Sequence, residues 1–161
     1  ECIRSALGSL WDKRTGMFLA ASRDCRQIDI WGSAYATYIG ITTPEQAVQI
    51  AAYLGENYKS VVYRGQVRHL PGSEFWNRLL VPVQPGTYQN GAFWGTASGW
   101  VIAALVRSKP TLAAAMFHDL VADYKAHGIH ECINNDSRKL PHYVVSATNP
   151  YGVVRDLIDG K

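Results

Sequence analysis

The amino-acid sequence predicts an all-α domain built from helical hairpins, with short β-hairpins in the loops on one face. Three observations lead to this prediction: an internal repeat, helix signals at matching places in each repeat, and long aperiodic segments between helices. The chain has 161 residues, of which 47% are hydrophobic and 18% are charged. This length and composition are typical of one folded domain or a large part of one.

The internal repeat is clearest in two segments that combine tryptophan, glycine and small residues. Segment 30–34 reads Ile-Trp-Gly-Ser-Ala, and segment 93–97 reads Phe-Trp-Gly-Thr-Ala. Their tryptophans, Trp31 and Trp94, lie 63 positions apart, and a Leu-Pro pair at position 70 recurs at position 140. The repeating unit therefore has between 63 and 70 residues, which is long enough for two helices and a return loop.

The first unit predicts two helices of different character. Residues 30–39 are apolar on nearly all sides and rich in small residues, which predicts a buried inner helix. A second helix is expected to follow, with Thr43 as its N-cap, Pro44 at its first position and Glu45 in its first turn. Its apolar residues recur at helical spacing on one face, which predicts an outer helix with one side in water.

The second unit repeats this order. Residues 95–107 are mostly apolar, and Ser108 is expected to cap an amphipathic helix that begins near Pro110 and ends at Gly128. Residues 3–11 read as the end of an earlier helix, and residues 146–158 as a later one. The chain is therefore expected to contain about six helices.

Three segments between the helices lack periodicity and contain glycine, proline, asparagine and aromatic residues. They cover residues 15–28, 65–88 and 128–145. Loops longer than about 12 to 15 residues within a domain are usually functional or disordered, and these contain too many aromatic residues for disorder. We expect them to form a functional face, with short strand pairs around residues 17–18 and 129–133.

Three motifs on this face resemble a known family. They are Asp-Ile-Trp-Gly-Ser-Ala-Tyr-Ala at 29–36, Tyr-Gln-Asn-Gly-Ala-Phe-Trp at 88–94 and Ile-His-Glu-Cys-Ile-Asn at 129–134. Over residues 29–155 the chain resembles the six-hairpin glycosidase superfamily, whose fold is an (α/α)6 toroid. The resemblance implies hydrolysis of a glycosidic bond by paired carboxylates, with no metal ion and no cofactor.

A closed ring of six such units would need roughly 380 to 420 residues. The resemblance therefore implies that residues 1–161 are one domain or fragment, with two and a half to three hairpins from the C-terminal part of a glycoside hydrolase toroid. A partial toroid exposes two hairpin faces. We expect a missing N-terminal segment, or a second copy of the chain, to cover them.

Two carboxylates are the catalytic candidates, because glycoside hydrolysis needs one acid and one base or nucleophile. Glu131 comes first, since it lies in a segment of alternating character and matches the late carboxylate strand of the family. The alternative is that Glu131 pairs with an arginine or lysine, such as Arg138, and only fixes the loop. Asp29 comes second, with the alternative role of a helix N-cap. The other loop carboxylates are Asp24, Glu74 and Asp136.

Aromatic and amide residues are the candidates for sugar contacts, because sugars combine flat C–H faces with hydroxyl groups. The candidates are Tyr88, Gln89, Asn90, Trp94, Trp31, Trp76 and His69. For Trp31 and Trp94 the alternative is core packing. For the Asn-Gly pair at 90–91, the alternative is that it only forms a turn.

Other function classes fit the sequence less well. The net charge of +3 is scattered along the chain, which does not indicate a nucleic-acid partner. No apolar run reaches the roughly 20 residues that a membrane span needs. The five histidines show no metal-ligand spacing, and Cys132 is expected to be a buried structural thiol. The alternative to a glycosidase is a non-catalytic carbohydrate-binding or assembly domain with the same fold.

Overall fold

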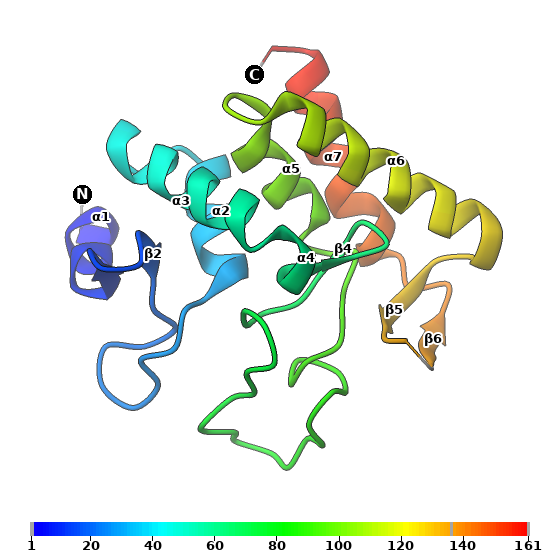
Figure 1. The fold of residues 1–161 in the computed structure, drawn as a ribbon, viewed down its shortest axis with the longest axis horizontal. Coiled ribbons are helices and arrows are strands. Elements are labelled where there is room, and N and C mark those ends of the chain that lie inside the picture. The colour runs from blue at the N-terminus through cyan, green and yellow to red at the C-terminus, as the bar shows by residue number, and fades with distance from the viewer. Residues whose placement is uncertain (1, 136, 161) are drawn as a thin grey trace.

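The computed structural model describes residues 2–135 and 137–160, with side chains from residue 5 onward. Within these residues, seven α-helices and three two-stranded antiparallel sheets make up the fold (Figure 1). About 47% of the chain is helical and 14% lies in short strands. The architecture is therefore mixed α/β, and the prediction of an all-α partial (α/α)6 toroid is wrong.

The helices and strands alternate along the chain. The helices are α1 (Cys2–Leu7), α2 (Ile30–Tyr38), α3 (Pro44–Glu56), α4 (Tyr58–Val61), α5 (Ser98–Val106), α6 (Pro110–His127) and α7 (Val145–Ile158). The strands are β1 (Trp11–Asp12), β2 (Met17–Phe18), β3 (Val62–Tyr63), β4 (Gln66–Val67), β5 (His130–Ile133) and β6 (Arg138–Pro141). Each pair of consecutive strands forms one hairpin. The strands expected around residues 17–18 and 129–133 are thus present as β2 and β5.

Local sequence signals account for the ends of the long helices. Thr43 caps α3 in a capping box, because its hydroxyl accepts a hydrogen bond from the Gln46 amide and the Gln46 side chain accepts one from the Thr43 amide. Helix α6 begins at Pro110 as expected, but the prediction that Ser108 caps it is wrong. The N-cap position belongs to Lys109, which makes no side-chain capping bond.

Helix α5 is the centre around which the other helices pack. Helices α2, α3, α6 and α7 all contact it, and six of its nine residues are buried. Gly99 lets α7 approach closely, since a Cβ atom at this position would lie 2.8 Å from Cα of Pro150. A side chain larger than glycine would separate the two helices.

The arrangement around α5 explains why the toroid prediction failed. A helix that is apolar on every side buries itself best when neighbours cover all of its faces. Here four helices cover one central helix, instead of consecutive hairpins standing side by side around an axis. The loops contain one hairpin, β3–β4, in addition to those that the sequence predicted around residues 17–18 and 129–133.

The β3–β4 hairpin lies against α6 through its two-residue turn. Arg64 and Gly65 both have positive φ values, 52° and 72°, as a tight turn matching the strand twist requires. A Cβ atom on Gly65 would lie 2.4 Å from the backbone nitrogen of Leu120 in α6. Only glycine allows this contact between the turn and the helix.

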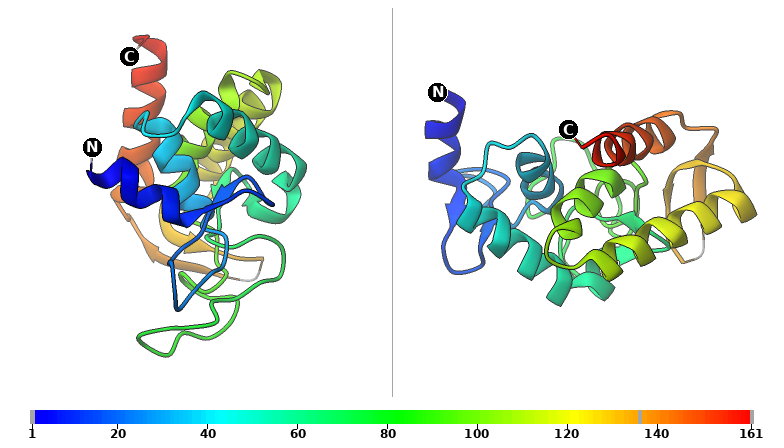
Figure 2. Two further views of the ribbon diagram at one scale, coloured as in Figure 1. Left: turned by 90° about the vertical axis from the view of Figure 1, so that its left-hand side faces the viewer. Right: turned by 90° about the horizontal axis from the view of Figure 1, so that it is seen from above.

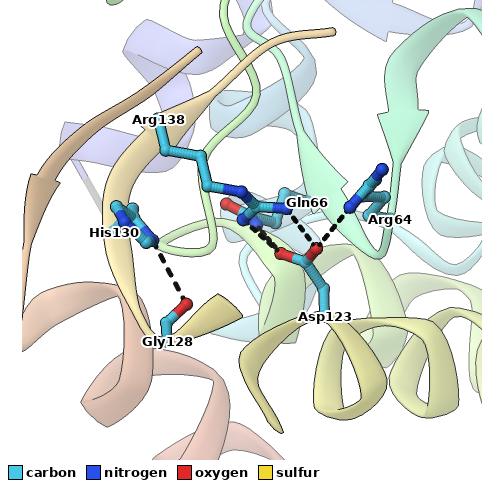
Figure 3. Close-up of polar contacts among 6 residues, drawn as sticks. All are labelled: Arg64, Gln66, Asp123, Gly128, His130 and Arg138. Atoms are coloured by element: carbon cyan, nitrogen blue, oxygen red, sulfur yellow. Dashed lines mark hydrogen bonds and ion pairs between the residues drawn. The ribbon is translucent and has the colours of Figure 1, made fainter. Parts of the chain in front are cut away.

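Asp123 of α6 holds two hairpins onto that helix, as Figure 3 shows. Its carboxylate forms a bidentate pair with Arg138 of β6, at 2.7 and 3.0 Å. It also accepts hydrogen bonds from Arg64 at 3.2 Å and from Gln66 at 3.0 Å, both in the β3–β4 hairpin. Burial alone would raise the pKa of Asp123, but the bonds and charges of the two arginines outweigh it and lower that pKa. We call these four residues the Asp123 clamp.

The remaining chain lies at the edges of the helical core. Figure 2 shows α1 at one end of the molecule and the end of α6 at the other, while the segment between β4 and α5 extends away from the helices. Among the described residues, no helix has both the length and the apolar character needed to cross a bilayer.

Replacing Asp123 by alanine should destabilise the fold by about 3 kcal/mol, because two arginines would lose their buried carboxylate partner. Urea unfolding followed by circular dichroism measures this change. The matched control is Asp119→Ala, one turn earlier on α6, where the side chain is 56% exposed. The control should change the free energy of unfolding by less than about 0.5 kcal/mol. Equal effects of the two variants would contradict the clamp.

Candidate functional site

Four of the predicted sugar-contact residues form one aromatic cluster. Trp31 of α2 stacks on His69, with ring centroids 3.7 Å apart and planes inclined by 20°. Trp76 also lies against His69, with ring centroids 6.0 Å apart and planes inclined by 58°. Trp94 packs edge-on against Trp31 at 5.9 Å. The structure thus brings together four residues that are far apart in the sequence. We call Trp31, His69, Trp76 and Trp94 the aromatic cluster.

Backbone carbonyls fix the orientation of all three indole rings in the cluster. The Nε1 atom of Trp31 donates to the carbonyl of Val67 at 3.3 Å, and that of Trp94 donates to the carbonyl of Tyr88 at 3.2 Å. Trp76 donates from Nε1 to the carbonyl of Gln89 at 2.9 Å. Each indole N–H is therefore already bonded. Trp94 is buried and one face of Trp31 is covered by His69, which leaves the half-buried Trp76 as the ring most open to a ligand.

Asn90 builds the turn that carries two of the other predicted contact residues. Its side chain is buried, accepts a hydrogen bond from the Trp76 amide at 2.8 Å and donates one to the Val83 carbonyl at 2.8 Å. Asn90 therefore has a structural role, which agrees with the alternative that the Asn-Gly pair forms a turn. Tyr88, with a positive φ of 42°, and Gln89 are exposed at the tip of the turn.

The segment before α5 connects this turn to two hairpins. Trp94 exchanges two backbone hydrogen bonds of 2.9 Å with Val67 of β4, and Phe93 exchanges two of 2.8 Å with Ile133 of β5. The tryptophan is only 4% exposed, which agrees with the core-packing alternative for its ring. These pairings bring β5, which carries Glu131, next to the segment that carries Trp94.

Asp29 is the N-cap of α2. Its side chain accepts a hydrogen bond from the Gly32 amide at 2.9 Å, which is the structural alternative considered for this residue. Burial raises the pKa of Asp29, although hydrogen bonds from the backbone of Gly32 and Trp31 act in the opposite direction. The carboxyl therefore keeps its proton to a higher pH than an exposed aspartate does.

Glu131 is half-buried on β5, between the register pairs His130–Pro141 and Cys132–Lys139. Arg138, its suggested structural partner, instead pairs with Asp123. Within the described residues, no hydrogen bond or ion pair joins the carboxyl groups of Glu131 and Asp29. Burial raises the pKa of the neighbouring thiol of Cys132 to about 11, which keeps it protonated and unreactive at neutral pH.

The other loop carboxylates have different surroundings. Asp24 forms an exposed ion pair with Arg78, and Asp136 lies outside the described residues. Glu74 accepts a hydrogen bond of 3.3 Å from Gln27, which also bonds the carbonyl of Phe75 and the amide of Asn77. Gln27 thereby holds the loop that carries Trp76, a role that the sequence does not indicate.

Two further aromatic residues extend the cluster and were absent from the sequence predictions. Trp100 of α5 lies 6.2 Å from Trp31, and Tyr35 lies 4.9 Å from Trp100, measured between ring centroids. The spacing of Trp31 and Tyr35 was an available signal, because residues four apart share one face of a helix.

His69 is neutral within this aromatic surrounding. Burial lowers its pKa to about 4, and its Nε2 atom is buried with no hydrogen-bond partner among the described residues. Below its usual pKa of about 6.5, the histidine takes up a proton in the unfolded chain but not in the folded protein. Stability is therefore lost as the pH falls from about 6.5 towards 4.

The His69→Phe variant should be less sensitive to acid than the wild type, because phenylalanine keeps the stacking but takes up no proton. Between pH 7 and pH 4, the wild type should lose about 3 kcal/mol more of its free energy of unfolding than the variant. Urea unfolding at a series of pH values measures both proteins. Parallel pH profiles would show that His69 does not titrate as described.

Comparisons of the chain with protein-family models, curated proteins and solved structures found no match. Among the described residues, no group of three or more histidine, cysteine, aspartate or glutamate side chains is placed to hold a metal ion. The assignment of a function therefore depends on the geometry of the aromatic cluster and its neighbours.

Proposed function

We propose that this chain binds carbohydrate at the aromatic cluster, with Trp76 as the stacking ring and Trp31, His69 and Trp94 packed beneath it as its support. The observation that carries the proposal is the fixed orientation of the three indoles, each held by a backbone carbonyl. Rings that are already ordered lose little conformational entropy when a ligand stacks on them. The half-buried Trp76, on an extended loop, is the ring best placed for such stacking.

Polar groups around the cluster match the hydroxyl groups of a sugar. Gln89 and Tyr88 are exposed at the tip of the turn whose backbone anchors Trp76 and Trp94. Glu74 is exposed two residues before Trp76. Amide, phenol and carboxylate groups beside flat aromatic faces provide both kinds of contact that a sugar ring requires. The neutral His69 adds no charge, which favours uncharged sugars.

Replacing Trp76 by alanine should weaken oligosaccharide binding about tenfold or more, since the ring provides the exposed stacking face. An array of neutral oligosaccharides identifies the ligand for the wild type, and calorimetry then compares the variants. Gln89→Ala should weaken binding less, by removing hydrogen bonds only. The control is Phe117→Ala, an exposed aromatic on α6 away from the cluster, which should bind as the wild type does. Unchanged binding by Trp76→Ala would contradict the proposal.

Hydrolysis of a glycosidic bond is a second candidate function, favoured by one observation. Burial raises the pKa of Asp29, which is the direction that a general acid in glycoside hydrolysis needs. Asp29 directly precedes α2, which carries Trp31, and Glu131 lies on the strand paired to the Trp94 segment. These two carboxyl groups are the residues that hydrolysis would use as acid and base.

Two conservative variants test hydrolysis separately from binding. Asp29→Asn should reduce turnover of the bound oligosaccharide more than a hundredfold while keeping the α2 cap, because asparagine caps helices as well as aspartate does. Glu131→Gln should have a similar effect on turnover, and both should retain binding. Product release measured by chromatography decides the question. If both variants turn over the oligosaccharide as fast as the wild type does, Asp29 and Glu131 are not part of the mechanism. If the wild type binds the oligosaccharide but does not hydrolyse it, carbohydrate binding is the only function supported.

A further inference from the structure

A second site lies between α2, α5 and α7, apart from the loops. Helices α2 and α7 both pack against α5 (Figure 2), and between the three helices is a surface hollow of about 550 Å³. This volume is within the range of small-molecule sites. The residues of interest in its lining are Tyr35, Tyr38, Trp100, Asn149, Arg155 and Asp156.

Three aromatic rings form one wall of the hollow. The centroid of Tyr35 lies 4.9 Å from that of Trp100, with planes inclined by 55°, and 6.4 Å from that of Tyr38, with planes inclined by 45°. All three side chains line the same hollow. Aromatic rings within about 6 Å of a bound cation attract it through their electron-rich faces.

A carboxylate lies within the same hollow. The hydroxyl of Tyr38 donates to Oδ2 of Asp156 at 2.7 Å, which links α2 to α7 and engages one of the two carboxylate oxygens. Arg155 also lines the hollow, and its Nε lies 4.0 Å from Oδ2 of Asp159, with which it forms an exposed ion pair. Asp156 lines the same hollow as the three aromatic rings.

We propose that the hollow between α2, α5 and α7 binds a small organic cation with an alkylated ammonium group. The rings of Tyr35, Tyr38 and Trp100 surround the alkyl groups, and Asp156 balances the positive charge. An anionic ligand is disfavoured by the carboxylate. A neutral ligand of the same shape keeps the apolar contacts but loses the attraction to the rings and to Asp156.

Choline chloride and its uncharged isostere 3,3-dimethyl-1-butanol are the probes, measured with the full chain by calorimetry and by shifts of aromatic NMR signals. Choline should bind about tenfold more tightly than the isostere. Asp156→Asn should weaken choline binding about fivefold or more, while asparagine still accepts the Tyr38 hydrogen bond and preserves thermal unfolding. Tyr35→Ala, at a position 44% exposed, should weaken choline binding without unfolding the protein.

Matched controls separate this site from the aromatic cluster and from general charge effects. Asp159→Asn removes a carboxylate of the same helix that is paired with Arg155, and Trp76→Ala alters the aromatic cluster only; both should bind choline as the wild type does. Equal binding of choline and its isostere would overturn the proposal. So would unchanged binding by Asp156→Asn, or the absence of choline binding at concentrations of tens of millimolar.

Discussion

The fold depends most on one buried carboxylate, that of Asp123. Its partners come from two hairpins that share no strand, and both hairpins contribute to the candidate site. The β3–β4 hairpin continues into His69, and β5 and β6 carry Glu131 and Arg138. Between them runs the Trp94 segment, bonded to β4 on one side and to β5 on the other. The position of the aromatic cluster relative to α6 therefore follows from where Asp123 holds these hairpins.

Around this frame, the structure uses aromatic residues in two different ways. In the aromatic cluster, backbone carbonyls engage the indole N–H groups and fix the orientation of the rings. Between α2, α5 and α7, the rings lie beside the carboxylate of Asp156, which accepts a hydrogen bond from Tyr38. Trp31 and Trp100 are in contact between the two regions. We proposed an uncharged sugar for the first region and an organic cation for the second, because the nearby ionisable groups differ.

Signals within a few residues predicted much of the secondary structure but little of the arrangement in space. Thr43 and Pro44 indicated the start of α3, and the apolar run of α5 indicated a buried helix. Because this run is apolar on every side, it does not indicate which face of α5 contacts which neighbouring helix. The central position of α5 was therefore missed, and a toroid was expected instead. The β3–β4 hairpin was missed, because its Arg-Gly turn lacks the Asn-Gly, Asp-Gly or Gly-Gly pair that is typical of two-residue hairpin turns. The stack of Trp31 on His69 joins residues 38 positions apart, and no local pattern indicates it.

The Asp123 clamp also implies an order for the assembly of the fold. The bonds from Arg138 join residues 15 positions apart, whereas the bond from Arg64 spans 59 positions. Closing the longer loop costs about 1 kcal/mol more in chain entropy than closing the shorter one. Helix α6 and the β5–β6 hairpin can therefore associate first, at lower entropic cost, through the two hydrogen bonds from Arg138 to Asp123. The β3–β4 hairpin then docks onto α6, and Arg64 becomes the second arginine bonded to the Asp123 carboxylate. The aromatic cluster is completed in the same step.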